Sequence, residues 1–77
     1  MATLKDLRER ALLSQIELAK LLGVTSRTIW TWEQGVAKPS TSNRRKLVVA
    51  LGVSAQELLQ AIEESQRKED DNLRAAA

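Results

Sequence analysis

The chain consists of short segments in which apolar residues recur three and four positions apart, separated by polar breaks. This spacing places apolar side chains on one face of a helix, and it occurs at about residues 4–11, 15–22, 26–33, 41–51 and from 55 onward. Few aromatic residues, no Asn-Gly or Asp-Gly pair and no sustained alternation of apolar and polar residues argue against strands. The pattern therefore predicts an all-α protein of five helices.

Helix start and stop signals frame these segments. Thr3–Asp6, Ser14–Glu17 and Ser54–Glu57 each place an acidic side chain three residues after a capping hydroxyl. This is the spacing of a capping box, although the first one carries Asp where Glu or Gln is preferred. Gly23 and Gly52 follow the second and fourth segments, where a glycine ends a helix in a left-handed backbone conformation. We therefore expect helix boundaries at these residues.

Residues 15–34 have the features of two helices that cross through a tight turn. Ala19 is small where the two helices must approach closely, and Gly23 permits the turn. The positions expected to face inward are all apolar: Leu18, Leu22, Val24, Ile29 and Trp32. The second helix then has a free side, which carries Ser26, Arg27, Trp30 and Thr31. This is the arrangement of a helix-turn-helix whose second helix enters the major groove of DNA.

Composition narrows the range of functions. The 77 residues include no Cys, His or Tyr, which excludes disulfides and thiolate metal sites and leaves acid/base chemistry to carboxylates and lysines. We therefore expect no enzymatic activity, no catalytic residue, no metal site and no cofactor. No apolar run reaches the length of a membrane span, so a cytoplasmic protein without membrane contacts is expected. Nothing in the chain implies a small-molecule ligand.

Charge is distributed unevenly. The formal net charge is +2, but residues 1–50 include nine Lys or Arg and four Asp or Glu, whereas residues 51–77 include three and six. The basic half of the chain is a candidate for contact with a polyanion, although a stripe of basic side chains is often only a face exposed to solvent.

The composition changes after Glu63, because the next nine residues include no apolar side chain. We therefore expect a DNA-binding domain over residues 1–63 and a polar extension over residues 64–77. The extension either continues the fifth helix or is disordered, and past about Lys68 disorder is favoured.

Several spaced blocks resemble a known family. Residues 13–25 read LSQIELAKLLGVT, and residues 28–35 read TIWTWEQG. They are followed by KPS at 38–40 and by ALGVSAQELL at 50–59. These blocks are similar, in order, to those of Xre-type helix-turn-helix domains, the relatives of phage repressors and Cro. The resemblance implies a compact five-helix fold and a homodimer, at least on DNA, bound to a pseudo-palindromic operator of double-stranded DNA.

The resemblance also implies roles for individual residues. Arg27 is the strongest candidate to read a base, because its guanidinium fits the two acceptors of guanine. The candidates for base contact are Ser26, Arg27, Trp30 and Thr31. The candidates for phosphate contact are Gln15, Thr25, Thr28, Lys38, Ser42 and Asn43. Arg8 and Glu33 match a pair that ties the first helix to the end of the third.

Some positions depart from the family pattern. Leu12 stands where the family usually has Gly, so a different bend between the first two helices is expected. Thr41 and Arg44 stand where apolar residues are usual. Trp30 replaces a small or polar residue, and three interpretations stay open: it covers an apolar edge, meets a partner, or contacts a thymine methyl or sugar.

We therefore expect a sequence-specific DNA-binding transcriptional regulator of bacterial or phage type, acting as a repressor. The alternative is a protein-interaction or antitoxin-like regulatory module. The exposed Trp30 and the acidic C-terminal part of the chain favour that alternative.

Overall fold

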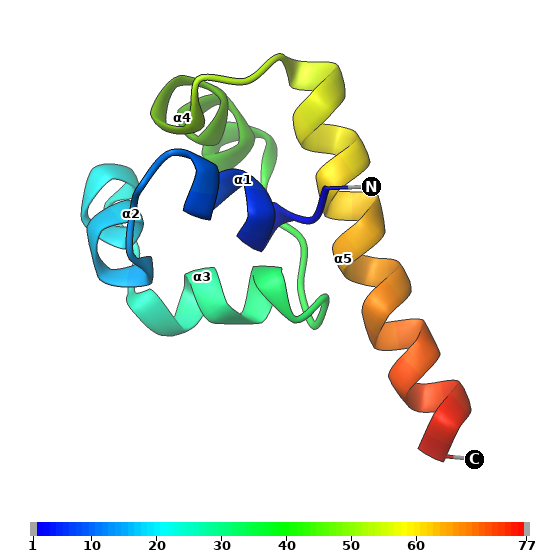
Figure 1. Cartoon of the computed structure of the whole chain (residues 1–77). Coiled ribbons are helices and arrows are strands. Elements are labelled where there is room, and N and C mark those ends of the chain that lie inside the picture. Colours follow the sequence, from blue (N-terminus) through cyan, green and yellow to red (C-terminus); the bar gives the residue numbers. More distant parts are fainter. Residues whose placement is uncertain (1, 77) are drawn as a thin grey trace.

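The fold consists of five helices. A computed structural model describes the backbone of residues 2–76 and the side chains of residues 2–67, and in this part there are no strands. The helices are α1 (Leu4–Arg10), α2 (Gln15–Leu22), α3 (Ser26–Glu33), α4 (Thr41–Leu51) and α5 (Ala55–Ala76) (Figure 1). The expectation of an all-α, five-helix fold is confirmed. The bounds of the first four helices and the start of α5 agree with the sequence-based expectations to within one residue.

Capping side chains explain where the helices begin. The Ser14 hydroxyl accepts from the N–H of Glu17 at 3.0 Å, and the Glu17 carboxylate accepts from the N–H of Ser14 at 3.0 Å. Thr3 and Asp6 form the same reciprocal pair at α1. The Ser14 N–H lowers the pKa of Glu17 below its ordinary value. The cap is therefore fully present at neutral pH, and its contribution to stability is lost as the pH falls through this lowered pKa.

All five helices contribute to one core. The buried apolar residues are Leu4, Leu7, Leu18, Ala19, Leu22, Ile29, Trp32, Leu47, Leu51, Leu58, Ala61 and Ile62. α2 packs against α3 and α4, and α5 packs against α1, α3 and α4. Ala19 is 3% exposed, consistent with a small residue where helices approach. This packing leaves one side of α3 free of the core.

The segment that follows α3 packs against α5. Gly35 is buried with a φ of +79°, and a Cβ at this position would overlap the carbonyl oxygen of Ser65. Ser65 is also buried, and its hydroxyl accepts from the N–H of Leu4 at 3.2 Å and donates to the carbonyl of Ala61 at 3.0 Å. A hydroxyl that is satisfied in both ways can be buried without an unpaired group.

This contact lies beyond the boundary that composition suggests. The packed part of α5 includes Ser65, two residues past Glu63. The expectation of disorder past about Lys68 concerns residues whose side chains lie outside the described part of the chain.

The bend between α1 and α2 requires a left-handed backbone at Leu12. Its φ is +60°, and it is the one non-glycine residue with positive φ in the described chain. Its side chain is 88% exposed, so no packing offsets the strain between Cβ and backbone. The bend thus has the conformation that a glycine favours, with a leucine in place of the family's glycine.

Replacing Leu12 should therefore stabilise the protein. A left-handed residue with a Cβ costs about 1–2 kcal/mol, and the greater freedom of Gly in the unfolded chain offsets about 0.5–1 kcal/mol of that gain. We expect Leu12→Gly to raise the free energy of unfolding by about 0.5–1 kcal/mol in urea titrations. Leu12→Ala keeps the strain and should be nearly neutral; equal effects of the two substitutions would contradict a left-handed residue here.

Gly23 and Gly35 have similar backbone conformations but different surroundings. Substituting each of them with Ala therefore distinguishes the cost of backbone strain from the cost of steric overlap. Gly23 has a φ of +73°, and a Cβ added there would meet no other atom within 4 Å, whereas a Cβ on Gly35 would meet the backbone of α5. We expect Gly23→Ala to cost about 1 kcal/mol of unfolding free energy. Gly35→Ala should cost about 3 kcal/mol, because α5 must also move. Similar losses in thermal or urea unfolding would show that α5 does not pack on Gly35.

Candidate nucleic-acid interface

The turn between α2 and α3 sets the start of α3. Gly23 ends α2 in a left-handed conformation, and the N–H of Val24 donates to the carbonyl of Ala19 at 3.0 Å. Thr25 caps α3 by accepting from the N–H of Thr28 at 3.2 Å, and the two threonine hydroxyls lie 2.9 Å apart. Thr25 and Thr28, both candidates for phosphate contact, therefore already hold the turn together.

α3 has one buried side and one exposed side. Ile29, Trp32 and Glu33 are buried, whereas Ser26, Arg27 and Trp30 are exposed. Thr31 is half-buried, and its hydroxyl donates to the carbonyl of Thr28 at 2.7 Å. Three of the four candidates for base contact thus project from the exposed side. Thr31 keeps a methyl group and hydroxyl lone pairs, but its proton is already engaged.

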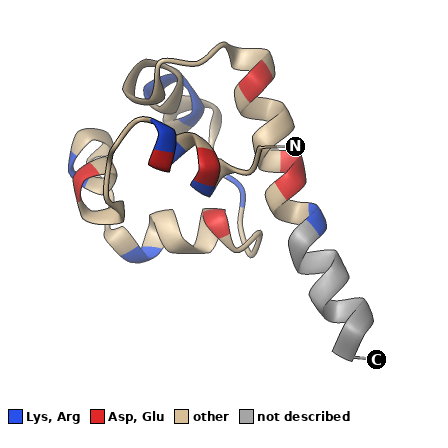
Figure 2. Ribbon diagram, in the orientation of Figure 1, with Lys and Arg blue, Asp and Glu red and all other residues tan. Residues whose placement is uncertain are grey.

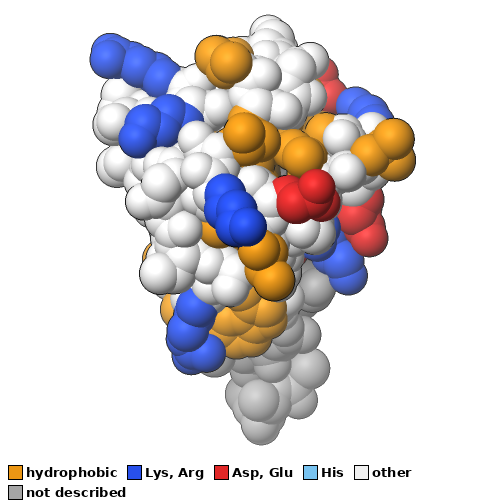
Figure 3. Space-filling view, turned by 90° about the vertical axis from the view of Figure 1, so that its left-hand side faces the viewer, with side chains coloured by type: hydrophobic (Ala, Val, Ile, Leu, Met, Phe, Trp, Pro, Cys, Tyr) orange, Lys and Arg blue, Asp and Glu red, His pale blue; other side chains and the backbone are white. Residues whose placement is uncertain are grey.

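Arg27 and Trp30 lie together on the exposed side. The guanidinium carbon of Arg27 is 5.3 Å from the centroid of the Trp30 ring, within the range of a cation–π contact. Figure 3 shows basic and hydrophobic side chains gathered at the lower end of that view, where α3 runs. The sequence signal for this contact is the i, i+3 spacing of the two residues. None of the three interpretations of Trp30 that the sequence left open included this contact with Arg27.

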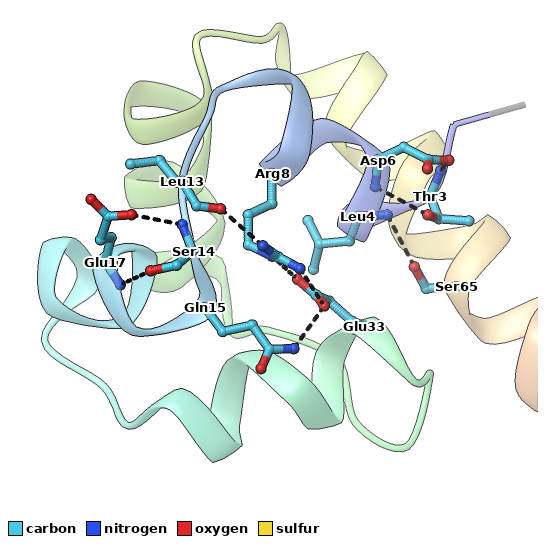
Figure 4. Close-up of polar contacts among 10 residues, drawn as sticks. All are labelled: Thr3, Leu4, Asp6, Arg8, Leu13, Ser14, Gln15, Glu17, Glu33 and Ser65. Carbon is cyan, nitrogen blue, oxygen red and sulfur yellow. Dashed lines mark hydrogen bonds and ion pairs between the residues drawn. The ribbon is translucent and has the colours of Figure 1, made fainter.

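A buried polar network fixes α3 relative to α1 and α2 (Figure 4). The Nε of Arg8 lies 2.5 Å from Oε2 of Glu33, and its Nη2 lies 3.3 Å from Oε1. The Nη1 of Arg8 donates to the carbonyl of Leu13 at 2.8 Å. The Nε2 of Gln15 donates to Oε1 of Glu33 at 3.0 Å. One carboxylate at the end of α3 thus joins α1 and α2, and Arg8 ties the connection between them to the same network.

This network changes what is expected of Gln15. One amide hydrogen of its side chain is bonded to Glu33. Its second amide hydrogen and its backbone N–H, at the first position of α2, are the donors left for a phosphate. Gln15 is thus held in place by the same carboxylate that holds α3.

The loop after α3 leads to a second helix N-terminus. Lys38 is exposed and Pro39 is buried. Ser40 caps α4 by accepting from the N–H of Asn43 at 3.3 Å. Ser42 is exposed and Asn43 is half-buried. These residues present side chains and backbone N–H groups at the start of α4.

The helix N-termini differ in charge. The first turns of α1, α2 and α5 carry Asp6, Glu17 and Glu57, whereas those of α3 and α4 carry no acidic residue. Figure 2 shows a basic residue at the start of α3 and an acidic one only at its far end. An N-terminus without an acidic side chain keeps its favourable interaction with an external anion. The first turns of α3 and α4 therefore carry no side chain that would repel a phosphate.

The fold and this interface define a helix-turn-helix DNA-binding domain. The family model for helix-turn-helix proteins matches residues 4–58. The chain belongs to this family, as an Xre-type domain, and carries the DNA-binding domain of a regulator. Comparisons with curated proteins and with solved structures gave no significant match. Within the described residues, no helix is both long and apolar enough to cross a membrane.

The buried pair predicts a clear contrast in stability. Glu33→Ala leaves the buried Arg8 without its counter-charge, and we expect it to lower the unfolding free energy by about 3 kcal/mol. The matched control is Arg10→Ala, which removes an exposed partner of Glu57 and should cost at most about 1 kcal/mol. Urea unfolding monitored by circular dichroism measures both. Equal losses would mean that the Arg8–Glu33 pair is solvated.

Proposed function

We propose that the protein is a sequence-specific transcriptional repressor that inserts α3 into the major groove of an operator. The observation that carries the proposal is the exposed side of α3, where the guanidinium of Arg27 lies beside the ring of Trp30. The first turn of α3, which includes Arg27, has no acidic residue. A protein bound at an operator blocks access of polymerase to an overlapping promoter.

Arg27 is proposed to read a guanine. A guanidinium can donate two parallel hydrogen bonds to the guanine acceptors in the major groove. Contact with Trp30 limits the orientations of this side chain before binding, which reduces the entropy lost when it is ordered on DNA. Ser26 and the edge of Trp30 are proposed to contact neighbouring bases. Thr31 is proposed to contribute its methyl group, because its hydroxyl proton is engaged within the helix.

Phosphate contacts are proposed to fix the position of α3. Gln15 and the start of α2 lie on one side of the turn, and the loop with Lys38 and the start of α4 follow α3. The proposed phosphate contacts are Gln15, Thr25, Thr28, Lys38, Ser42 and Asn43. Such contacts carry no sequence information but set the register of the reading helix.

Two copies are proposed to bind one operator. A single short helix contacts few bases, whereas two copies on half-sites about 34 Å apart place both reading helices on the same side of the duplex. Selection of an operator from a random DNA pool, followed by footprinting, tests this directly. Two protected half-sites one helical turn apart support the proposal. Failure to enrich any sequence would favour the protein-interaction alternative.

Two substitutions can distinguish a base contact, which recognises sequence, from a phosphate contact, which does not. On the selected operator, Arg27→Ala should cost about 1–3 kcal/mol of binding free energy, and much less on a scrambled duplex. Lys38→Ala should weaken binding to both duplexes alike and reduce the salt dependence by about one counterion. Titration of both duplexes at several salt concentrations measures these effects. An equal loss for Arg27→Ala on both duplexes would make Arg27 a phosphate contact instead.

Trp30 provides a test of how Arg27 is oriented. Trp30→Phe keeps an aromatic ring below the guanidinium and should retain most of the operator affinity. Trp30→Ala removes the ring and should weaken operator binding by about 0.5–1 kcal/mol, the size of an exposed cation–π contact. Combining each substitution with Arg27→Ala in a double-mutant cycle isolates the coupling between the two residues. Additive losses would show that Trp30 does not orient Arg27.

A further inference from the structure

Trp30 is an exposed aromatic residue on the side of α3 that faces away from the core. It is 40% exposed, whereas Trp32, two positions later on the same helix, is 5% exposed. Trp30 belongs neither to the buried core nor to the apolar residues packed against it. It also stands where the resemblance predicts a small or polar residue. The fold therefore leaves part of the apolar surface of this indole free for contact with a ligand.

The guanidinium of Arg27 lies over this ring, with its central carbon 5.3 Å from the ring centroid. No carboxylate among residues 2–67, whose side chains the structure describes, forms an ion pair with Arg27. A guanidinium can stack on an aromatic face while its N–H groups, which lie in its own plane, donate at its edge. Arg27 can therefore bind a base without leaving Trp30.

The geometry of a guanine contact determines where the ring of Trp30 would lie on DNA. Paired hydrogen bonds to the N7 and O6 atoms of guanine bring the guanidinium into the plane of that base. A ring stacked on the guanidinium then lies beside this plane, at the level of an adjacent base pair. Residues 27 and 30 are also about 4.5 Å apart along the helix axis, which is similar to the base spacing of about 3.4 Å. The edge of the indole would therefore face the neighbouring base pair.

The chemistry of the indole identifies that base pair. Apart from one N–H group the indole is apolar, and the apolar group that base edges present in the major groove is the C5-methyl of thymine. We propose that Arg27 and Trp30 together read a guanine and an adjacent thymine methyl group as one two-base unit. This inference rests on the proposed function, because it requires α3 to lie in the major groove. It adds the identity of a second base and the group by which that base is recognised.

Replacing the thymidine with 2′-deoxyuridine tests the proposal, because the two nucleosides differ only in the C5-methyl group. On the selected operator, the guanine that depends on Arg27 is first located by single-base replacement with the wild-type protein and Arg27→Ala. The thymine in the adjacent base pair is then replaced. We expect about fourfold weaker binding, which corresponds to about 0.8 kcal/mol for one buried methyl group. Replacing the T·A pair with C·G should also weaken binding, and 5-methylcytosine in place of that cytosine should recover about the same factor.

Substitutions at Trp30 show whether the indole is the group that contacts the methyl. Trp30→Ala should bind the thymine and deoxyuridine operators with nearly equal affinity, whereas Trp30→Phe should retain most of the difference because it keeps an aromatic ring. The control Lys38→Ala, on the loop after α3, should weaken binding to both operators by the same factor and leave their ratio unchanged. Circular dichroism checks that each variant is folded.

Three results would overturn the proposal. A selected operator without a thymine beside the guanine that depends on Arg27 would exclude the two-base unit. Equal affinity of the wild-type protein for the thymine and deoxyuridine operators would show that the methyl group is not recognised. An unchanged ratio in Trp30→Ala would assign the methyl contact to another side chain. In each case two protected half-sites would still support the proposed function, whereas failure to enrich any sequence would refute the proposed function and this inference with it.

Discussion

The position of α3, the helix proposed to read DNA, depends on the buried contact between Arg8 and Glu33. α3 has only eight residues, and a helix of that length is not stable by itself in water. Its orientation must therefore come from tertiary contacts. Because a buried carboxylate needs its counter-charge, Glu33 has to face Arg8, and this fixes the rotation of α3 about its axis. Ser26, Arg27 and Trp30 then face outward.

The same end of α3 is held by a second contact of a different kind. Gly35 follows Glu33 closely and packs against the backbone of α5 at Ser65, whose hydroxyl also accepts from the start of α1. The ion pair sets the rotation of α3, and the glycine contact sets its distance from α5. α1 takes part in both, through Arg8 and Leu4. The contacts that position α3 thus lie on its buried side and at its C-terminal end, away from the exposed side that is proposed to face DNA.

Local features could be predicted from the sequence, and tertiary ones only in part. Helix bounds follow from apolar spacing and from caps such as Ser14 and Glu17, which depend on residues a few positions apart. The role of Ser65 could not be predicted, because its burial depends on Leu4 and Gly35, which are distant in sequence. The bond from Thr31 to its own helix likewise depends on side-chain orientation, which spacing does not specify.

The residue three positions after each N-cap affects both the stability of a helix and its ability to accept an external anion. Three caps are followed three residues later by an acid, as in Ser14 and Glu17. Thr25 and Ser40 are instead followed by Thr28 and Asn43, which are neutral.

An acid at Thr28 or Asn43 would complete a capping box and stabilise its helix. It would also repel a phosphate at the helix N-terminus. The chain thus departs from the stabilising pattern only at α3 and α4, both of which are proposed to contribute contacts to DNA. Departures of this kind, where a local rule is broken without a structural need, are expected at functional sites.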